Sequence, residues 1–513
     1  MSSTRLTYTT GVRSPELDRD FEAALAAARG EEPSPLAHLV DGHEVEVGAV
    51  FAREDPSRRH RTASRAREGV ELAGAAVDAA RRAQREWRRL PHGERLAHLR
   101  ATARLIDERK IELAAIVSLE VGKVRTESIA EVEEAIDLID TYCASVESSD
   151  GFETPLGRLS PDERNTDVLR PYGVFGVIAP FNFPFALGFG MTAAALAAGN
   201  AVVLKPPEEA PRSGGAVARL LAEAGIPAGV ISLVNGGPAT GEALVGAGVD
   251  GIAFTGSAEV GREIQRRLSD GPFPRPVLAE MGGKNAALVG ASADLDAAAE
   301  GIARAAFGFS GQKCSACSRA IVVDEVHDEL VERLAAQAAV YSVGDPADPG
   351  VALGPVVNEA AVQRFERSAE AARRWGRVVA GGARAAGDGW FVEPTVVVEL
   401  PEWDELSRTE LFLPFLTVTR VPDFDAALAE ANAVPYGLTA GVFSQDDDEL
   451  DRFLDEIEAG VVYVNRRAGA TTGAWPGIQS FCGWKSSGLT GKGGLGPYYV
   501  QQFAREQSRT IVG

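Results

Sequence analysis

The chain has 513 residues, of which 45% are apolar and 24% charged, so it is long enough for two or three domains with substantial cores. Its formal charge of −21 disfavours a nucleic acid or an anionic membrane surface as a partner, because both would be repelled. Four cysteines do not make a disulfide framework in so long a chain, and the sequence opens without the pattern of a secretory signal. We therefore expect a reducing, cytoplasmic location.

The first third of the sequence predicts a hairpin followed by a helical region. Apolar and polar residues alternate over 38–51, which favours a hairpin. Apolar residues then recur at helical spacing from about 68 to 145, and we interpret the charged residues among them as solvated faces. The polar stretch 148–167 contains Pro and Gly, so we expect it to project from the core.

From residue 172 the pattern changes to alternating strands and helices. Short apolar runs predict strands at 174–178, 201–204, 230–234, 251–254 and 277–279, with helices at about 185–198, 211–224, 239–247 and 258–269. This order is typical of a doubly wound α/β sheet. A second series has strands near 286–289 and 319–323 and helices near 293–307 and 326–340, and it continues to about 460. We therefore expect two α/β lobes.

The stretch 171–204 carries no charge, which raises the question of a membrane span. A spanning helix needs an uninterrupted apolar segment of about 20 residues. Here Pro180, Asn182, Pro184, Asn200 and five glycines interrupt the stretch. We interpret it as buried core and expect no membrane partner.

Each of the five strands in the first series is followed by a Gly- or Pro-rich loop that carries a polar group. The loops are APFNFP (179–184), KPPEEAP (205–211), NGGPATG (235–241), TGSAEVG (255–261) and EMGGK (280–284). Ligands of open parallel sheets bind outside the carboxyl ends of the strands. The sequence therefore predicts a binding crevice at this edge of the sheet.

Several residues in these loops have both a binding and a structural interpretation. Ser257 begins a helix whose free backbone amides suit a pyrophosphate, although the neighbouring glycines also fit a plain tight turn. Lys205 and Glu208 are compatible with a ribose clamp or with a surface ion pair. As a clamp, Glu208 would repel a 2′-phosphate and so favour NAD over NADP.

Two further polar residues interrupt apolar surroundings. Asn182 lies in an apolar run, where its amide either caps a turn or points at a developing oxyanion. Glu280 ends an apolar strand and precedes two glycines, so its carboxylate is either satisfied by loop amides or held with a raised pKa as a general base.

The stretch GFSGQKCSACSR (308–319) holds two of the four cysteines, Cys314 and Cys317. A zinc site needs three or four ligands, and the six histidines show no ligand spacing near this loop. The context of a thioredoxin-like pair is also missing. These exclusions favour a nucleophilic thiol, with Lys313 and loop amides available to stabilise the thiolate. The pattern alone does not decide which cysteine is the nucleophile.

Six motifs occur in an order that resembles the aldehyde dehydrogenase superfamily: APFNFP, KPPEEAP, FTGSAEVG, EMGGK, GQKC (311–314) and ELFLP (410–414). The resemblance runs from about residue 45 to the C-terminus. It implies an α/β fold of two doubly wound Rossmann-type lobes with a small β oligomerisation extension. It also implies an NAD-binding domain (1–148 and 170–279), a catalytic domain (280–470) and oligomerisation segments (149–169 and 490–513).

The resemblance assigns a nucleophile (Cys314), an oxyanion-binding amide (Asn182) and a general base (Glu280). The cofactor contacts that it implies are Ile178, Pro180, Phe181, Lys205, Glu208, Gly237, Thr255, Gly256, Ser257, Gly282, Glu410 and Phe412. The implied reaction is oxidation of an aldehyde through a cysteine thioester, with NAD as the cofactor and no metal. A carboxylate at 280 favours a free acid as the product, because CoA-acylating relatives lack it.

The strings GQKCSACSR and NRRAGATTGA (465–474) are similar to the glutamate γ-semialdehyde (1-pyrroline-5-carboxylate) dehydrogenase branch. The substrate contacts that this similarity implies are Phe183, Lys313, Ser315, Gly473, Ala474 and Phe481. The Gly-Ala turn offers backbone amides for a carboxylate, although it also fits a plain glycine-rich loop. Departures from the pattern are SFCG (480–483), Leu413, Pro207 and three residues inserted before Thr472.

Three alternatives remain at the level of sequence: an aldehyde dehydrogenase for another aldehyde, an inactive scaffold of the same fold, and a cysteine hydrolase. The hydrolase would need a histidine base near the thiol, and the sequence shows none nearby. The expected partners are a small aldehyde and a second copy of the chain in a homodimer or higher oligomer.

Overall fold

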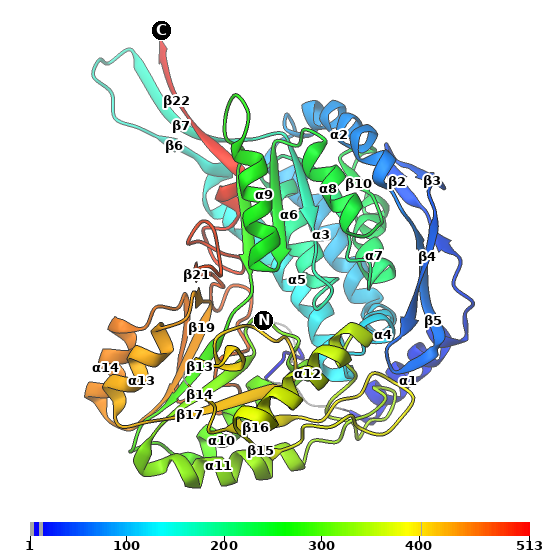
Figure 1. Ribbon diagram of the computed structural model, residues 1–513. Coiled ribbons are helices and arrows are strands. Elements are labelled where there is room, and N and C mark those ends of the chain that lie inside the picture. Colours follow the sequence, from blue (N-terminus) through cyan, green and yellow to red (C-terminus); the bar gives the residue numbers. More distant parts are fainter. Residues whose placement is uncertain (1–4, 10–13, 402) are drawn as a thin grey trace.

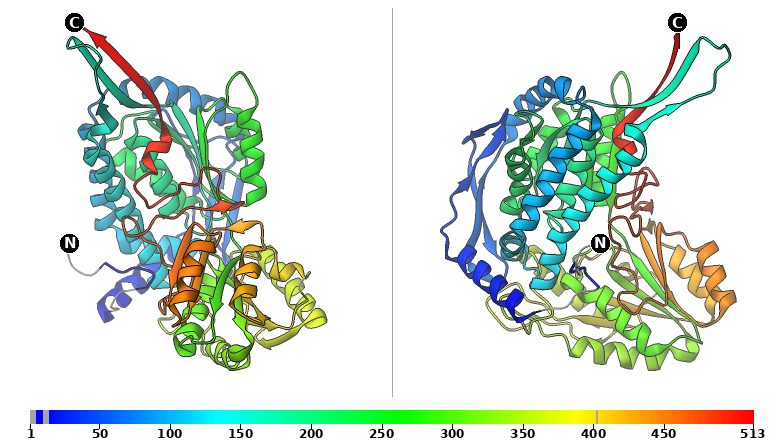
Figure 2. Two further views of the ribbon diagram at one scale, coloured as in Figure 1. Left: turned by 90° about the vertical axis from the view of Figure 1, so that its left-hand side faces the viewer. Right: turned by 180° about the vertical axis from the view of Figure 1, so that it is seen from behind.

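Two lobes, each built on a sheet, make up most of the molecule (Figure 1). The computed structural model describes residues 5–9, 14–401 and 403–513. A ribbon of strands projects from the first lobe, as both further views show (Figure 2). The prediction of two α/β lobes is confirmed.

The first lobe contains a seven-stranded sheet of described residues in the order β12-β11-β8-β9-β10-β2-β3. Its strands are β2 (His38–Val40), β3 (His43–Val45), β8 (Val174–Ile178), β9 (Ala201–Lys205), β10 (Ile231–Leu233), β11 (Gly251–Gly256) and β12 (Val277–Met281). The strands from β12 to β10 are parallel. The intervening helices are α6 (Ala186–Ala197), α7 (Pro211–Glu223), α8 (Pro238–Gly246) and α9 (Ala258–Ser269). All of these strands and helices lie where the sequence predicts them.

The first four residues of β9 are apolar, and the packing of the strand explains why. Val202 and Leu204 pack into one core with α6, whereas Ala201 and Val203 pack into another core with α2 (Ala73–Trp87). A strand covered by helices on both faces has no side that benefits from polar residues. The five residues of β9, including Lys205, are accordingly all buried.

The predicted hairpin forms, and it extends the parallel sheet with antiparallel strands. Leu39 of β2 pairs with Leu233 of β10, and Asp41 and Gly42 turn the chain with φ of 54° and 78°. The neighbouring strands β1 (Pro35–Leu36), β4 (Val50–Asp55) and β5 (Arg58–Arg67) form a separate sheet, in which β5 pairs with both of the others.

The predicted helical region consists of α2, α3 (His92–Glu108), α4 (Lys110–Val121) and α5 (Arg125–Ser148), and α1 (Pro15–Gly30) packs against α4. The interpretation of its charges as solvated faces is wrong around the start of α5. Lys123 and Glu131 are fully buried, and Glu134 is 6% exposed. Lys123 pairs with Glu131, which also accepts from the backbone N–H groups of Phe185 and Ala186, so these charges are satisfied inside the protein.

The second lobe contains another seven-stranded sheet of described residues, in the order β15-β16-β17-β14-β13-β19-β20. Its strands are β13 (Asn285–Val289), β14 (Cys317–Val323), β15 (Arg377–Ala380), β16 (Thr395–Val398), β17 (Phe415–Val421), β19 (Thr439–Phe443) and β20 (Val461–Val464). Only β15 is antiparallel to its neighbour among these strands of the described chain. The helices are α10 (Leu295–Phe307), α11 (Asp324–Ala339), α12 (Glu359–Trp375), α13 (Phe424–Asn432) and α14 (Asp447–Glu456).

The projecting ribbon combines segments from distant parts of the chain. Strand β7 (Glu163–Pro171) pairs with β6 (Glu153–Pro155) on one side and with the C-terminal β22 (Ala504–Val512) on the other. The pairing of β22 with β7 runs from Ala504 opposite Pro171 to Val512 opposite Glu163. The prediction that 148–167 projects from the core is confirmed (Figures 1 and 2).

Shorter elements complete the fold: the two-stranded pair β18 (Tyr436–Gly437) and β21 (Trp484–Lys485), and the 3-10 turns at 70–72, 150–152, 308–311, 405–407 and 500–503. Among the described residues, none of the helices has the length and apolar character needed to cross a membrane.

Candidate active site

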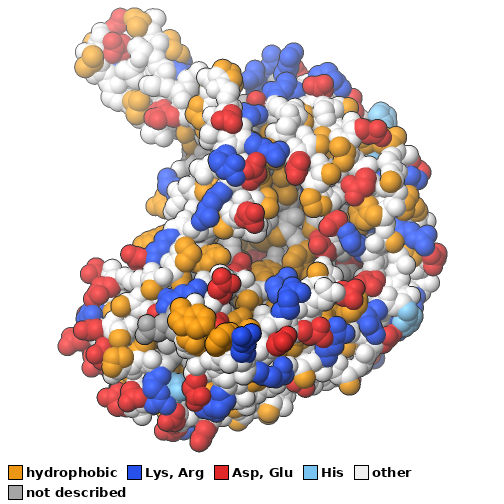
Figure 3. Space-filling model, in the orientation of Figure 1, with side chains coloured by type: hydrophobic (Ala, Val, Ile, Leu, Met, Phe, Trp, Pro, Cys, Tyr) orange, Lys and Arg blue, Asp and Glu red, His pale blue; other side chains and the backbone are white. Residues whose placement is uncertain are grey.

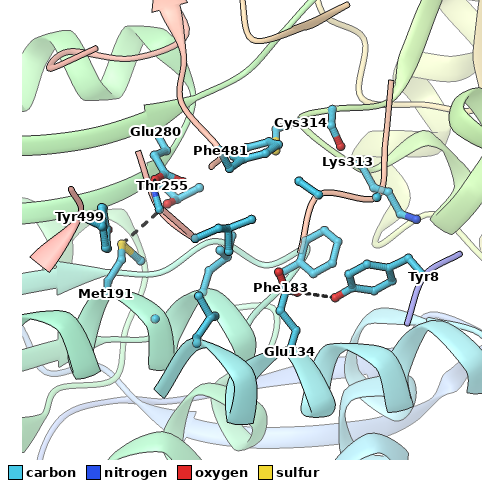
Figure 4. Close-up of a pocket in the computed structure, with 18 of the residues that line it drawn as sticks. Tyr8, Glu134, Phe183, Met191, Thr255, Glu280, Lys313, Cys314, Phe481 and Tyr499 are labelled. Atoms are coloured by element: carbon cyan, nitrogen blue, oxygen red, sulfur yellow. Dashed lines mark hydrogen bonds between the residues drawn. The ribbon is translucent and has the colours of Figure 1, made fainter. Parts of the chain in front are cut away.

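One cavity brings together the predicted catalytic residues and the predicted substrate-binding residues. Cys314 and Glu280 line it together with the proposed carboxylate-binding residues Ser315, Gly473 and Ala474. The other predicted residues on its wall are Phe183, Thr255, Lys313 and Phe481. These residues come from distant parts of the sequence, and Figure 4 shows six of them around one space: Phe183, Thr255, Glu280, Lys313, Cys314 and Phe481.

A neighbouring groove runs along the carboxyl ends of β8, β9 and β11. The predicted cofactor contacts on its wall are Ile178, Pro180, Phe181, Lys205, Glu208, Gly256 and Ser257. The space-filling view shows the hollow between the lobes on the face that carries α9, with apolar side chains inside it (Figure 3). The binding crevice predicted from five consecutive loops is therefore present.

Cys314 follows a strained turn at the end of α10. Phe309 and Ser310 have φ of 48° and 52°, in the left-handed region that non-glycine residues rarely adopt. A Cβ at Gly311 would lie 2.0 Å from the carbonyl oxygen of Leu413. The turn is thus held by packing against a distant segment, and Gly311 is required because no side chain fits.

The structure distinguishes the two cysteines of the C-x-x-C pair. Cys314 lines the cavity, whereas Cys317 begins β14, is 1% exposed and packs in the core of the second lobe. Its thiol donates to the carbonyl of Arg319, and burial raises its pKa to about 12. None of the four cysteines, all of which lie in described residues, forms a disulfide. Cys317 is therefore a structural neighbour and Cys314 is the accessible thiol.

The electrostatics around Cys314 correct one expectation. Its pKa is raised by burial and by the carboxylates of Glu410 and Glu280, and the backbone amides of Ser315 and Cys314 oppose this rise. The amides thus act as predicted. Lys313 does not, because its ammonium pairs with Glu127 at 2.7 Å. The expectation that Lys313 is available to stabilise the thiolate is wrong.

Glu280 lies at the carboxyl end of β12 in a desolvated position. Burial raises its pKa to about 7, although the backbone N–H of Gly494 donates to its Oε1 at 2.7 Å. A loop amide thus binds the carboxylate and burial raises its pKa, while the role of general base stays a prediction. Such a carboxylate can accept a proton from water at physiological pH.

Asn182 lies behind the cysteine loop. It is 3% exposed, and its side-chain amide donates to the carbonyl of Gln312 at 3.0 Å. Because a side-chain amide carries two N–H groups, this bond orients the second one. The bond to Gln312, which precedes Cys314 by two positions, thus fixes Asn182 against the cysteine loop.

The groove holds both proposed ribose-binding residues in a charged environment. Glu208 pairs with Arg53 of β4, whose Nε also donates to the Glu208 carbonyl at 3.0 Å. Burial lowers the pKa of Lys205, while Glu209 and Glu208 oppose this shift. Ser257 caps α9 by accepting from the backbone N–H of Val260 at 3.3 Å. The ion pair of Glu208 thus forms with an arginine that the sequence did not single out.

The remaining predicted cofactor residues do not line the groove, although Phe412 and Gly237 contact residues that do. Glu410 accepts from the backbone N–H of Gly283 at 3.0 Å, and burial raises its pKa to about 7. A Cβ at Gly282 would lie 1.9 Å from Glu410 Oε2, so only glycine allows this approach. Phe412 packs edge-to-face on Phe181, with ring centroids 5.7 Å apart. Gly237 lies beside the Glu208 carboxylate.

Sequence reasoning missed a row of carboxylates on α5. Glu127, Glu131 and Glu134 are spaced four and three residues apart, so they lie on one face of the helix. Glu127 pairs with Lys313, and Glu131 pairs with Lys123. Glu134 lines the cavity, and burial raises its pKa to about 7. The helical spacing of these glutamates was the available signal. Among the described residues, no group of metal-ligating side chains could hold an ion.

The fold and the site define a class of protein. A family model for the aldehyde dehydrogenase family matches residues 44–508, and the chain belongs to that family. A 1-pyrroline-5-carboxylate dehydrogenase of Geobacillus sp. (strain WCH70) is 36% identical over 499 residues, which cover 96% of this chain and 95% of the relative. The protein of the same name from Bacillus cytotoxicus is 36% identical over 488 residues, covering 94% and 93%.

Solved structures show the same likeness. A 1-pyrroline-5-carboxylate dehydrogenase from Thermus with bound NAD has 34% identity and a TM-score of 0.94, with 100% of both chains covered. Proline utilization A from Bdellovibrio bacteriovorus has 34% identity and a TM-score of 0.93. This chain spans about half of that protein: the match covers 98% of this chain and 53% of the other.

Proposed function

We propose that this protein oxidises L-glutamate γ-semialdehyde to glutamate with NAD, through a thioester on Cys314. The observation that carries the proposal is the cavity itself, which opens on the Cys314 thiol and the Glu280 carboxylate and also on the amides of the Gly473–Ala474 turn. An aldehyde that bears a carboxylate can place its aldehyde carbon at Cys314 and its carboxylate at the Gly473–Ala474 amides. The names of the similar proteins support the same substrate.

The residues of the groove fit NAD. Lys205 and Glu208 offer a donor and an acceptor for ribose hydroxyls, and the N-terminus of α9 offers amides for a pyrophosphate. Glu410 is held close to the backbone at Gly282, where a second ribose would be bound. When bound, NAD supplies the hydride acceptor for the oxidation.

The chain's own residues then perform the remaining steps. The Cys314 thiol gives its proton to Glu280, which later releases it to solvent, and the sulfur attacks the aldehyde carbon. Asn182 and the Cys314 backbone N–H hold the oxyanion that forms. After loss of the hydride, the acyl group remains on the sulfur as a thioester. Glu280 accepts a proton from water, the hydroxide adds to the thioester carbon, and the Cys314 sulfur leaves as glutamate is released.

Steady-state kinetics test this proposal. Purified protein should form NADH with glutamate γ-semialdehyde at a higher kcat/KM than with simple, aromatic or amino aldehydes of similar size. Equal kcat/KM across that panel would contradict the substrate and would favour an aldehyde dehydrogenase of another specificity. No NADH with any aldehyde would contradict the activity and favour a scaffold role.

We also infer that the chain forms a homodimer or a higher oligomer through the β6–β7–β22 ribbon. The ribbon carries exposed apolar side chains, among them Leu159, Ile511 and Val512 at 100%, 48% and 63% exposure. An exposed strand edge beside apolar side chains favours pairing with another chain. Light scattering that finds a monomer at micromolar concentration would contradict this inference.

A further inference from the structure

A short N-terminal segment contributes a wall to the substrate cavity. Tyr8 lines the cavity with Phe183 and Ala474, although it lies more than 170 positions from either in sequence. Figure 4 shows its ring beside Phe183 and its hydroxyl pointing toward Glu134. The family resemblance includes this segment in the NAD-binding domain (1–148) and does not make Tyr8 a substrate contact.

The ring of Tyr8 is fixed by aromatic neighbours on two sides. It packs edge-to-face on Phe183 and on Trp475, with ring centroids 5.6 Å apart in both pairs. Its hydroxyl donates to Glu134 Oε2 at 2.5 Å. The ammonium of Lys313, the residue before the nucleophile, lies 5.4 Å from the ring centroid. Four contacts thus hold the ring in one orientation in the cavity wall.

The rest of the segment 5–9 contacts helix α5 and the loop that contains Gly473 and Trp475. Arg5 forms an ion pair with Asp137 of α5, and Trp475 donates its indole N–H to the other oxygen of Asp137 at 2.8 Å. Leu6 is 8% exposed. Thr9 packs so closely on Gly473 that a Cβ there would lie 2.8 Å from its Cγ2 atom. The segment 5–9 therefore touches both the aromatic wall and the proposed carboxylate-binding turn.

Tyr8 also completes the row of carboxylates on α5. Glu127 and Glu131 form ion pairs with Lys313 and Lys123, respectively. Glu134 accepts a hydrogen bond from the Tyr8 hydroxyl. The Lys123 ammonium lies 3.5 Å from the centroid of the Phe183 ring. The rings of Phe183 and Tyr8 therefore lie beside these charged groups, of which Glu134 and Lys313 already line the cavity.

We propose that Tyr8 is a specificity-determining residue, and that segment 5–9 closes the substrate pocket so that only a short, unbranched aldehyde reaches Cys314. This inference rests on the proposed function, because it concerns the substrate range of the same site. The ring supplies the barrier, and the hydrogen bond to Glu134 keeps the ring in place.

The test compares Tyr8→Ala with Tyr8→Phe in the full-length protein, using glutamate γ-semialdehyde, propanal and the bulkier phenylacetaldehyde. Tyr8→Ala removes the ring and should raise the ratio of kcat/KM for phenylacetaldehyde to that for propanal by ~10- to 100-fold, the range that pocket size controls. Tyr8→Phe keeps the ring and should leave this ratio within about 3-fold of wild type, because the pocket keeps its size. Tyr498→Phe, at a tyrosine that is 57% exposed, is the matched control.

Two results would overturn the role of Tyr8: an unchanged ratio in a folded Tyr8→Ala variant, or an equal change in Tyr8→Phe. If Tyr8→Ala does not fold, Tyr8→Leu replaces it with the same expected direction. The two proposals fail differently. Wild-type protein that is inactive toward every aldehyde contradicts the proposed function, whereas active wild type with unaltered selectivity in the variant contradicts only the role of Tyr8.

Discussion

The cofactor groove and the substrate cavity lie side by side, yet they are assembled in different ways. The groove is built mainly from loops that follow neighbouring strands of a single sheet, at β8, β9 and β11. The cavity takes residues from the N-terminal segment, α5, the cysteine loop and the turns at 473–474 and 494–495. A site of the first kind follows from strand order, whereas a site of the second kind depends on how distant segments pack.

The largest effect is expected for Cys314→Ala, which should remove catalysis in the cavity and leave cofactor binding in the groove unchanged. Cys314→Ala should abolish NADH formation, because no other described thiol lines the cavity. Cofactor binding, measured by calorimetry, should remain close to wild type because the groove is intact. Cys317→Ala is the matched control: it should keep turnover while lowering the free energy of unfolding by about 1 kcal/mol through a small core cavity. Unchanged turnover in Cys314→Ala would exclude it as the nucleophile.

Glu280→Gln should slow hydrolysis of the thioester by ~10²- to 10⁴-fold, the usual contribution of a general base. A rapid-mixing experiment should then show a burst of NADH followed by slow turnover. In wild type, the carboxyl is protonated below its pKa of about 7 and cannot accept a proton. The rate of hydrolysis should therefore rise between pH 6 and pH 8, and this rise should be absent in Glu280→Gln. A pH profile that is the same in both would contradict the assignment.

Lys123→Met tests how much the buried ion pair between Lys123 and Glu131 contributes to the free energy of unfolding. Lys123 and Glu131 form a fully buried ion pair, so the variant leaves an unpaired carboxylate in the interior. Breaking such a pair costs about 3–5 kcal/mol of the free energy of unfolding. Denaturant titration measures this loss, and Lys110→Met, at a lysine of α4 whose side chain is 35% exposed, serves as the control. Equal losses in the two variants would show that burial of the pair is not what matters.

The smallest effect concerns the groove alone. Glu208→Gln should weaken NAD binding by ~10-fold, as expected for loss of a hydrogen bond to a charged group. Binding of NADP should weaken less or improve, because the negative charge that opposes a 2′-phosphate is gone. Calorimetric titration with each dinucleotide measures both changes. An equal loss for both would indicate that Glu208 acts through its ion pair with Arg53 and not on the ribose.

Local patterns were sufficient for the elements and for the groove. The alternation of short apolar runs and helical stretches predicted β8 to β12 and α6 to α9, and the loops after these strands form the groove wall. Local patterns were misleading for charge. Lys123, Glu131 and Glu134 lie in a helical region rich in charged residues, and nothing in that region shows that other parts of the fold bury them. Lys313 was likewise assigned to the thiolate, but a helix nearly 190 positions away binds it.

By itself, the sequence determined the two α/β lobes, the thiol loop and the carboxylate at 280, because strand periodicity and the desolvation of a strand end are local properties. The tertiary structure decided which cysteine faces the cavity, what binds Lys313 and Glu208, and that Tyr8 forms a wall of the pocket. Those outcomes depend on side chains that meet across large sequence separations, and their burial, which sets their charge and their pKa, exists only after the lobes have packed.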